Sequence, residues 1–501
     1  MKAFLMHRDH DFDLDGELPA NGAALEQDLE LAVLLTGMGA GDGFMSEIAR
    51  RALLLSLSDP EAIAYRQQIL TDCLEHPAVV RELYALAGEA LTAERKVWGG
   101  ILRDSPRTIL STSVAKMELF VGFLRRLREM ADEHASTFSS PGFTRFFAML
   151  RTELDEEYIE LIEDHLKTLK FKGGMLICAR LAAGNKGRGY KLRRPREQGL
   201  LGRVFDRSGY SFTVPDRDMT AFKVLSELED RGVNLVANAL AQSVDHVRSF
   251  FIMLRGEIGF YVGALNLSER LAELGQPTAF PVPVARGELA LSARGVYDVC
   301  LALTTGQPVV GNDVDGDNKS LVMITGANQG GKSTLLRSIG LAQLMTQCGM
   351  FVGADSLRVN VCDGLFTHYK REEDDTMESG KLDEELARMS EIANHISANS
   401  MLLCNESFAA TNEREGSQIA REVVTALLDE GVRVLFVTHM FDLADGFYRR
   451  GRDSALFLRA ERGIEGARPF KLSEAAPLPT SYGGDSYRKI FGSSVDAARA
   501  K

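Results

Sequence analysis

Two patterns of hydrophobic spacing divide this chain near residue 285. Between residues 25 and 274, apolar residues recur at intervals of three and four, as in LLLSLSDPEAIAYRQQIL and VAKMELFVGFLRRL. This spacing places apolar side chains on one face of a helix, and Ser58, Asp59 and Pro60 provide a helix start. After residue 285, short apolar runs alternate with helical stretches, which is typical of an α/β fold.

Glycine-rich and charged segments interrupt the helical pattern between residues 171 and 217. This stretch contains GG, AAGNKGRG, RRPRE and the alternating GYSFTV, which predict loops and short strands. Three prolines, Pro277, Pro281 and Pro283, mark the end of the helical part. We therefore expect a multidomain chain with these parts: a loose or lightly docked N-terminal tail over residues 1–24, helices over 25–106, helices with a loop and strand insert over 107–218, helices over 219–284, and an α/β domain over 285–501.

The α/β part contains four candidate strands, LVMIT, SMLLCN, VRVLFVT and ALFLRA, and helices follow three of them. Strands that alternate with helices in this way form a mostly parallel sheet with helices on both faces.

The first of these strands leads into a phosphate-binding motif. Residues 321–334 read LVMITGANQGGKST, with Gly326, Gly331, Lys332 and Ser333 in the G-x-x-x-x-G-K-[ST] spacing. In such a loop, backbone N–H groups surround phosphate oxygens, the lysine reaches the β- and γ-phosphates, and the hydroxyl suits Mg²⁺. The alternative, a glycine-rich turn with a stray lysine, does not explain the flanking strand and helix. We therefore expect the chain to bind a nucleoside triphosphate, ATP, with Mg²⁺.

Polar residues follow two further strands of the α/β part. MLLCNE ends in Asn405 and Glu406, where a phosphate-loop ATPase normally has a magnesium-binding carboxylate followed by a glutamate that prepares the attacking water. An amide at Asn405 predicts weak magnesium affinity and slow turnover; the alternative is that the pair only caps a strand. His439 follows VRVLFVT and is placed to contact a γ-phosphate or to orient water.

Charge is distributed unevenly along the chain. The net charge is −12, yet residues 167–196 contain ten Lys or Arg and no acidic residue. Such a segment predicts contact with a phosphate backbone, although runs of cations are also common on solvated faces. The candidates for DNA contacts are Lys186, Arg188, Lys191, Arg193, Arg194 and Arg196.

Cysteine spacing and hydropathy indicate the compartment. The six cysteines have no paired C-x-x-C spacing, which argues against structural zinc and against a disulfide framework. We find no uninterrupted apolar run long enough to span a bilayer and no apolar signal core at the N-terminus, so we expect a cytoplasmic protein without a membrane partner.

These motifs resemble those of the MutS mismatch-repair ATPase family. TGANQGGKST resembles its TGPNMGGKST loop, with Asn328 on a distinctive asparagine, and VTHMFDL resembles its ATH-F-x-x-L histidine motif. NESFAATNEREG matches the length of its DE-x-x-x-x-T-x-x-x-x-G stretch and places Thr411 and Gly416 on fixed positions. TSYGGDSYRKIFG resembles its closing S-Y-G segment, and LSDPEAIAYRQQIL and LEHPAVVRELY resemble its helical core.

The resemblance implies α-helical core and lever domains followed by an ABC-type ATPase domain. It also implies a homodimer or heterodimer in which two ATPase domains share composite nucleotide sites, with Ser379 nearest the serine that completes the partner's site. The implied nucleotide-binding residues are Gly326, Asn328, Gly330, Gly331, Lys332, Ser333 and Thr334. Ser333, Asn405 and Glu406 are the implied metal-site residues, and Glu406, His439 and Lys332 the implied catalytic ones.

The sequence departs from the family in three places. Asn405 replaces the magnesium-binding aspartate, and Val309 or Val310 stands where an adenine-stacking aromatic is expected. None of the 26 phenylalanines has Glu two residues on, so the family's Phe-x-Glu mismatch-reading wedge is missing.

The sequence thus predicts a MutS-like, DNA-binding ATPase that acts as a dimeric, nucleotide-driven clamp or switch in DNA repair or recombination, without standard mismatch reading. Duplex and branched DNA are the expected partners, through residues 167–207 and the helical lever. One alternative is a DNA-independent nucleotide switch that scaffolds a protein partner, which the negative net charge favours. A nuclease is disfavoured because no metal-ligand cluster is found outside the ATP site.

Overall fold

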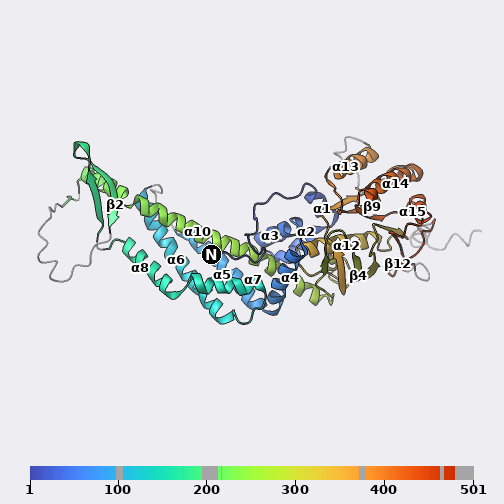
Figure 1. Cartoon of the computed structure of the whole chain (residues 1–501), viewed down its shortest axis with the longest axis horizontal. Helices are drawn as coiled ribbons and strands as arrows, with labels where there is room; N and C mark the ends of the chain where they lie inside the picture. Colours follow the sequence, from blue (N-terminus) through green and yellow to red (C-terminus); the bar gives the residue numbers. More distant parts are fainter. Residues whose placement is uncertain are drawn as a thin grey trace, which may run out of the picture. The chain divides into compact units, whose positions relative to one another are not determined.

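The computed structural model forms two compact units (Figure 1). It describes residues 1–97, 105–172, 174–193, 213–215, 217–371, 380–462 and 468–479. The first unit comprises Met1–Phe4 and Ala78–Ile258, and the second comprises Leu5–Pro77 and Gly259–Lys501. The expected change from helices to an α/β fold is present. The second unit, however, also includes helical residues 5–77 and 259–284, which lie before the boundary predicted at residue 285.

Long helices build the first unit. They are α5 (Pro77–Lys96), α6 (Pro106–His134), α7 (Pro141–Glu153), α8 (Glu156–Leu169) and the first part of α10 (Met219–Glu273). Side chains cap three of them: Ser105, Ser140 and Asp155 each accept a hydrogen bond from a backbone N–H three residues on. These caps satisfy amides that a helix start leaves without an intrahelical partner.

Aromatic rings fill the interior of the first unit. Phe120 of α6 stacks on Phe251 of α10 with ring centroids 5.5 Å apart, and both side chains are fully buried. Around α7, Phe143 and Phe147 are also fully buried and stack at 5.8 Å. Burial of such rings is a large source of stability, and the Phe120–Phe251 pair joins α6 to α10.

A basic hairpin emerges from this unit where the sequence predicted loops and short strands. Its strands, β1 (Leu176–Leu181) and β2 (Gly187–Arg193), pair antiparallel around η1 (Ala183–Asn185), with a bulge between Cys178 and Arg180. Ile177 packs against α10 so closely that a Cβ on Gly232 would lie 2.6 Å from it. Cys178 is exposed on β1, whereas the other five cysteines of the chain are buried.

The helix α10 contributes to both units. By length and composition alone it could cross a membrane, but 78% of its most apolar window is buried inside the protein, as in a core helix.

The second unit begins with a docked segment, within residues 1–24, for which the sequence predicted a loose or lightly docked tail. Leu5, Met6 and Phe12 are at most 2% exposed, and buried Arg66 donates from Nε to the Met6 carbonyl at 2.8 Å. The apolar residues of this segment are too few and too irregular to reveal a helical or strand period, which explains why the sequence left both a loose and a lightly docked tail open. The helices that follow are α1 (Gly22–Asp28), α2 (Leu31–Gly39), α3 (Gly43–Leu54) and α4 (Pro60–Glu75).

Two sheets form the rest of the second unit. The six-stranded sheet has the order β12-β11-β6-β10-β9-β8. All its neighbouring strands are parallel except β12, which pairs antiparallel with β11. These strands are β6 (Leu321–Gly326), β8 (Leu365–Tyr369), β9 (Met401–Asn405), β10 (Arg433–Val437), β11 (Ala455–Ala460) and β12 (Leu472–Glu474). The four-stranded sheet has the order β3-β7-β4-β5, with β3 (Val282–Val284), β4 (Leu291–Val296), β5 (Asn312–Asp315) and β7 (Ser356–Asn360). The four strands predicted from sequence are β6, β9, β10 and β11, so the mostly parallel sheet is confirmed.

Helices cover both faces of the six-stranded sheet. The helices of this part are α11 (Val299–Thr305), α12 (Lys332–Gln347), α13 (Lys381–His395), α14 (Glu413–Asp429) and α15 (Phe441–Tyr448). Met323 and Phe436 share one buried cluster with side chains from α13, α14 and α15. On the other face, α12 lies so close that a Cβ on Gly340 would meet Leu403 at 2.6 Å. Strands covered on both faces read as unbroken apolar runs, which is why the sequence revealed them.

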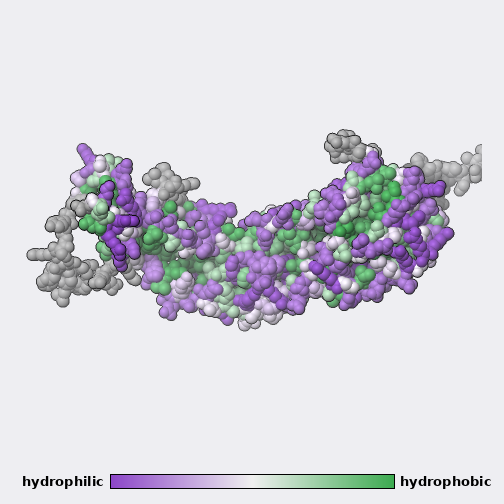
Figure 2. All heavy atoms as spheres, turned by 45° about the horizontal axis from the view of Figure 1, so that its top comes forward, coloured by the Kyte–Doolittle hydropathy of each residue, from purple (hydrophilic) through white to green (hydrophobic). Residues whose placement is uncertain are grey.

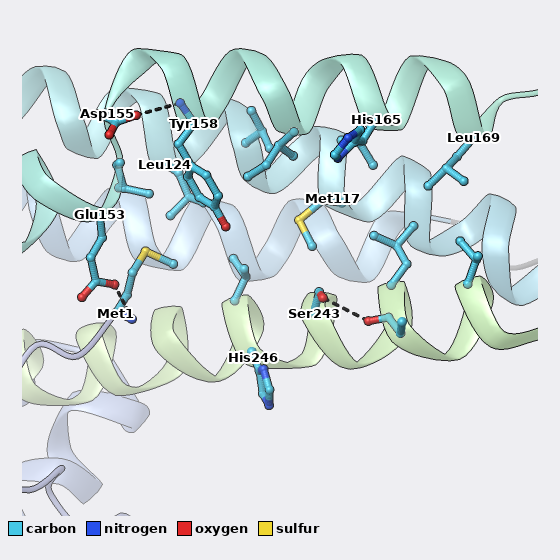
Figure 3. Close-up of a pocket in the computed structure, with 18 of the residues that line it drawn as sticks. Met1, Met117, Leu124, Glu153, Asp155, Tyr158, His165, Leu169, Ser243 and His246 are labelled. Carbon is cyan, nitrogen blue, oxygen red and sulfur yellow. Dashed lines mark hydrogen bonds and ion pairs between the residues drawn. The ribbon is translucent and has the colours of Figure 1, made fainter. Parts of the chain in front are cut away.

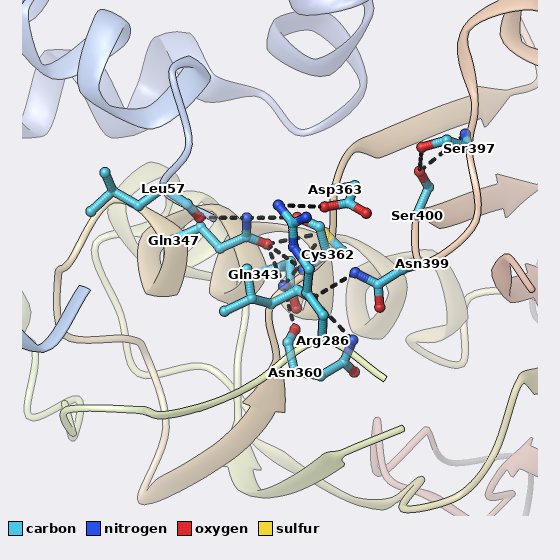
Figure 4. A network of polar contacts seen from close by, with 11 residues as sticks. Leu57, Arg286, Gln343, Gln347, Asn360, Cys362, Asp363, Ser397, Asn399 and Ser400 are labelled. Atoms are coloured by element: carbon cyan, nitrogen blue, oxygen red, sulfur yellow. Dashed lines mark hydrogen bonds and ion pairs between the residues drawn. The ribbon is translucent and has the colours of Figure 1, made fainter. Parts of the chain in front are cut away.

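A buried polar network fixes the C-terminal end of α12 (Figure 4). The Gln347 amide donates to the carbonyls of Leu57 and Cys362 at 2.9 and 3.0 Å, and its oxygen accepts from the Cys362 backbone N–H at 3.1 Å. Gln343, one turn earlier, donates to the Asn360 carbonyl at 3.0 Å. The network therefore joins α12 to the segment before α4 and to the β7–β8 connection.

Candidate functional site

A glycine-rich loop, residues 326–333, connects β6 to α12 at the carboxyl end of the parallel strands. Gly326 and Gly331 adopt φ values of +108° and +91°, which favour glycine. A Cβ on Gly326 would lie 2.8 Å from the Ala460 backbone nitrogen, and one on Gly330 would lie 2.7 Å from the Ala460 side chain. The glycines therefore let the loop turn against β11 with no room for a side chain.

The N-terminus of α12 presents free amide donors at this loop. Its N-cap is Gly331, and no side chain caps it. The first amides of a helix have no intrahelical acceptor, and the helix dipole adds partial positive charge there. The start of α12, including Ser333 and Thr334, can therefore bind an anion such as a phosphate group.

Lys332 adds a full positive charge within the loop. The residue is 5% exposed, and Nζ donates to the carbonyls of Gly326 and Ala327, both at 3.1 Å. Burial lowers the pKa of this ammonium, whereas the nearby Glu406 carboxylate acts in the opposite direction. An anionic ligand would stabilise this desolvated ammonium, because it could accept the third N–H and offset the buried charge.

Ser333 meets the end of β9. Its hydroxyl donates to Asn405 Oδ1 at 2.8 Å. Hydroxyl and amide oxygens are suitable ligands for Mg²⁺. In the described part of the chain, no group of three or more His, Cys, Asp or Glu residues could hold a metal ion by itself. The fit is therefore to an ion held largely by phosphate oxygens and water, as is usual for Mg²⁺.

Glu406 and His439 lie together beyond the ends of β9 and β10. Glu406 has φ +55°, and its backbone N–H donates to the Val437 carbonyl at 2.9 Å. Its Oε1 is 3.7 Å from His439 Nδ1. Interaction with His439 is the largest cause of the lowered pKa of Glu406, and Lys332 lowers it further. Glu406 is therefore held as a carboxylate that can orient or deprotonate water.

Two contacts position this pair. Glu413 Oε1, at the start of α14, accepts from the backbone N–H of Phe441 at 2.7 Å, which fixes the segment after His439. A Cβ on Gly416 would lie 2.4 Å from the Phe408 carbonyl, so α14 packs tightly against the turn after Glu406. These contacts explain why a glycine and a polar helix start follow Glu406 in the sequence.

Residues 468–472 also reach the glycine-rich loop, which the sequence analysis missed. Arg468 Nε donates to the Asn328 carbonyl at 3.2 Å, and a Cβ on Gly331 would lie 3.5 Å from the Phe470 carbonyl. Asn312 of β5 fixes this segment by donating to the Phe470 carbonyl at 3.1 Å and accepting from the Leu472 N–H at 2.8 Å. The Cα and Cβ of Phe470 also lie beside Gly331, and the residue is 48% exposed. No local pattern marks this segment, because Asn312 lies 158 residues from Phe470 in the chain.

Four of the six predicted DNA contacts lie on the basic hairpin: Lys186, Arg188, Lys191 and Arg193. Arg180 and Arg188 are cross-strand partners, and Cys178 pairs with Lys191. The exposed cations of the hairpin make no ion pair with any described residue; they are Arg180, Lys186, Arg188, Lys191 and Arg193. Two others of the ten are neutralised, because Lys167 pairs with Asp164 at 3.2 Å and Lys170 with Glu118 at 2.7 Å.

Three predicted residues, Ser379, Arg194 and Arg196, lie outside the described residues. The structure brings Lys332, Ser333, Asn405, Glu406 and His439 to one edge of the six-stranded sheet. The hairpin belongs to the other unit.

Comparison with known proteins agrees with these motifs. Residues 58–274 match the model of the MutS2 N-terminal domain, and residues 322–463 match that of MutS domain V. The DNA mismatch repair protein MutS of Chloroflexus aurantiacus is 28% identical over 225 residues, which cover 44% of this chain and 23% of that protein. MutS of Brevibacillus brevis is 27% identical over 235 residues, covering 44% and 27%.

A eukaryotic relative shows the same partial overlap. MutS protein homolog 4 of Mus musculus is 24% identical over 299 residues, covering 55% of this chain and 31% of that protein. The chain thus spans less than a third of the length of each of these relatives. Because the family models match in both the helical and the α/β parts, the chain belongs to the MutS family.

Proposed function

We propose that this chain is a MutS-like, DNA-binding ATPase that acts as a nucleotide-driven switch in DNA repair or recombination. The observation that carries the proposal is the meeting of Lys332, Ser333, Asn405, Glu406 and His439 at the carboxyl edge of one parallel sheet. Ligands of open α/β sheets bind at this edge, and these side chains suit a nucleoside triphosphate.

The roles of the residues follow from their positions. The amides at the start of α12 and the Lys332 ammonium would bind the β- and γ-phosphates. Ser333 and Asn405 would hold Mg²⁺, which supplies positive charge to the phosphate oxygens when bound. Glu406 would prepare the attacking water, with His439 orienting its carboxylate. Phe470 would provide an aromatic surface for the base, in place of the residue expected near Val309.

Slow turnover is part of the proposal. Asn405 supplies an oxygen but no negative charge, so the magnesium ion is held less firmly than by an aspartate. A slow site suits a switch, since the ATP-bound state then persists between partner-binding events.

The basic hairpin supports DNA as the partner. Its five described cations are exposed and unpaired among the described residues, and unpaired cations gain most from a phosphate backbone because each contact releases condensed counterions. Binding energy at the hairpin and at the ATP site would then be coupled in both directions.

We include a dimer in the proposal, formed through the ATPase domains. The support is the resemblance of the motifs to a family in which a second chain completes the nucleotide site. Sedimentation of the purified chain with and without ATP tests this part, and a monomer under both conditions would contradict it.

The central test measures ATP hydrolysis and DNA binding in one preparation. We expect slow, magnesium-dependent hydrolysis whose rate changes when duplex or branched DNA is added, and DNA affinity that falls steeply with salt. Absence of ATP binding would end the ATPase proposal. ATP binding without any DNA binding would leave a nucleotide switch that scaffolds a protein partner.

A further inference from the structure

A cavity of about 610 Å³ lies within the first unit at the base of the basic hairpin. Three elements form its walls: the C-terminal end of α8, the hairpin, and α10. Its lining comprises His165, Lys167, Thr168, Leu169, Phe171, Lys172, Gly174, Leu176, Leu192, Arg193 and Val236. A volume of this size is within the range of ligand sites and is large enough for a nucleotide.

The cavity combines an apolar floor with a cationic rim. Leu169, Phe171 and Val236 are partly exposed to it, and Leu176 is 47% exposed. Lys172 and Arg193 on the rim make no ion pair with any described residue. In Figure 2, where the hairpin lies at the left, hydrophobic side chains lie beside hydrophilic ones on this part of the surface. The chemistry therefore favours a ligand with a flat apolar body and a negative charge beside it.

The walls of the cavity are fixed by backbone contacts. Leu176 and Arg193 are direct cross-strand partners, so strand pairing fixes the positions of this apolar residue and this cation relative to one another. Phe171 is held in a turn by its own N–H, which donates to the Thr168 carbonyl at 3.2 Å, and by its carbonyl, which accepts from the Gly174 N–H at 2.9 Å. The site is therefore formed in advance, which reduces the entropy lost on binding.

An adjacent cavity differs from the first in the charged side chains that line it (Figure 3). It has a volume of about 750 Å³, runs between α6, α8 and α10, and shares His165, Leu169 and Val236 with the first. Its lining contains no Lys or Arg side chain, and at its far end the terminal ammonium of Met1 pairs with Glu153 at 2.8 Å, beside Asp155. The Lys and Arg side chains that could meet a phosphate therefore lie at the hairpin end.

We propose that the cavity at the hairpin base takes an unpaired nucleobase of a bound nucleic acid, while the hairpin cations contact the phosphates on either side of it. The inference rests on the DNA binding proposed above and specifies its substrate: DNA with single-stranded nucleotides next to a duplex. Unpaired bases are recognised by stacking on aromatic and apolar side chains, and taking an already unpaired base costs the least unstacking energy.

The test compares three DNA probes: a duplex, the same duplex with an unpaired thymine tail, and a single strand of equal length. We expect the chain to bind the tailed duplex on the order of tenfold more tightly than the blunt one, which is the gain expected for stacking one base. Phe171→Ala should remove this preference and leave blunt-duplex affinity unchanged. Phe222→Ala is the matched control, since Phe222 is 43% exposed on α10 but does not line the cavity.

A fluorescent base gives a second, direct readout. With 2-aminopurine at the first unpaired position, binding should change its emission in the parent and in Phe222→Ala, and not in Phe171→Ala. Leu192→Asn provides an independent floor variant if Phe171→Ala does not fold, as judged by circular dichroism.

The outcomes separate this inference from the proposed function. If no probe binds, the proposed DNA binding fails. If all probes bind but the tail adds nothing, or Phe171→Ala and Leu192→Asn keep the preference, the inference alone is overturned. Dodecanoate gives a further outcome. If it binds saturably to the parent but not to Phe171→Ala, and does not displace bound DNA, the cavity would be assigned to an anionic amphiphile. That result would also overturn the inference.

Discussion

The glycine-rich loop and the basic hairpin both carry positive charge, but they hold it in opposite ways. Lys332 is buried and hydrogen-bonded to two carbonyls, within a loop whose glycines permit no side chain. The hairpin cations are exposed and have no ion-pair partners among the described residues. A buried, oriented cation selects one ligand geometry, whereas exposed cations on long side chains attract any phosphate backbone. A single substitution at the loop should therefore cause a large loss of ATP hydrolysis, whereas each substitution at the hairpin should weaken DNA binding by a small amount.

The largest effect is expected at the loop. Lys332→Ala should lower ATP hydrolysis by at least about a hundredfold, because the lost charge has no replacement in the buried site. Steady-state phosphate release measures it. Lys319→Ala is the matched control, since Lys319 donates to the Asp453 carbonyl at the start of β6, away from the loop. Turnover like that of the parent in Lys332→Ala would contradict the assignment.

A second sharp effect is expected at the strand ends. Glu406→Gln should keep the Kd for ATP within about threefold and lower turnover about a hundredfold or more, because an amide cannot deprotonate water. Fluorescent-nucleotide titration and single-turnover hydrolysis separate the two quantities. Glu430→Gln, an exposed position at the end of α14, should behave as the parent. Hydrolysis retained in Glu406→Gln would mean that another residue prepares the water.

The basic segment, residues 167–196, should show smaller effects. Replacing Arg193, Arg194 and Arg196 by Ala in one variant should weaken DNA binding about equally at all sequences. The slope of the logarithm of the binding constant against the logarithm of salt concentration should become shallower by roughly two to three units. ATP binding should be unchanged. A triple variant at Arg449, Arg450 and Arg452, exposed in the second unit, makes the same change in net charge and serves as the control. An unaltered slope in the variant at Arg193, Arg194 and Arg196 would show that these cations meet no phosphate.

A smaller effect is expected from restoring a charge at the proposed metal site. Asn405→Asp should raise turnover severalfold and strengthen its magnesium dependence, because the carboxylate keeps the oxygen that accepts from Ser333 and adds a negative charge. A magnesium titration of kcat measures both. A lower rate in the variant would indicate that the site is adapted to the amide.

The smallest effect concerns pH. His439 is the largest cause of the lowered pKa of Glu406, whose ordinary value is 4.5. Without the imidazole this pKa should rise, so a smaller fraction of Glu406 is ionised at acidic pH. His439→Ala should therefore move the acidic limb of the pH–rate profile to higher pH. An unmoved limb in single-turnover measurements would show that Glu406 does not control it.

The two regions also differ in how far the sequence revealed them. The glycine-rich loop was predictable because the conformation at Gly326 and Gly331 excludes other residues, and because strands buried on both faces form unbroken apolar runs. Asn405, Glu406 and His439 were predictable because parallel strands end at the same edge of a sheet.

Other parts depend on tertiary contacts that leave no local pattern. Asn312, far away in the chain, helps to hold the backbone of Phe470 beside the loop. The docking of Leu5 and Met6 depends on Arg66 in the same way. For the hairpin, composition predicted the charge, but the cavity at its base required knowledge of how α8 and α10 pack.

The exposure of Cys178 makes the hairpin open to selective thiol labelling. Burial raises the pKa values of the thiols of Cys300, Cys348, Cys362 and Cys404 to about 12, and that of Cys73 well above normal, so these five stay protonated and unreactive at neutral pH. A maleimide dye added to the native chain should therefore label β1 alone, beside Lys191. The unmodified sequence thus already contains a site for a spectroscopic reporter on the surface where DNA is proposed to bind.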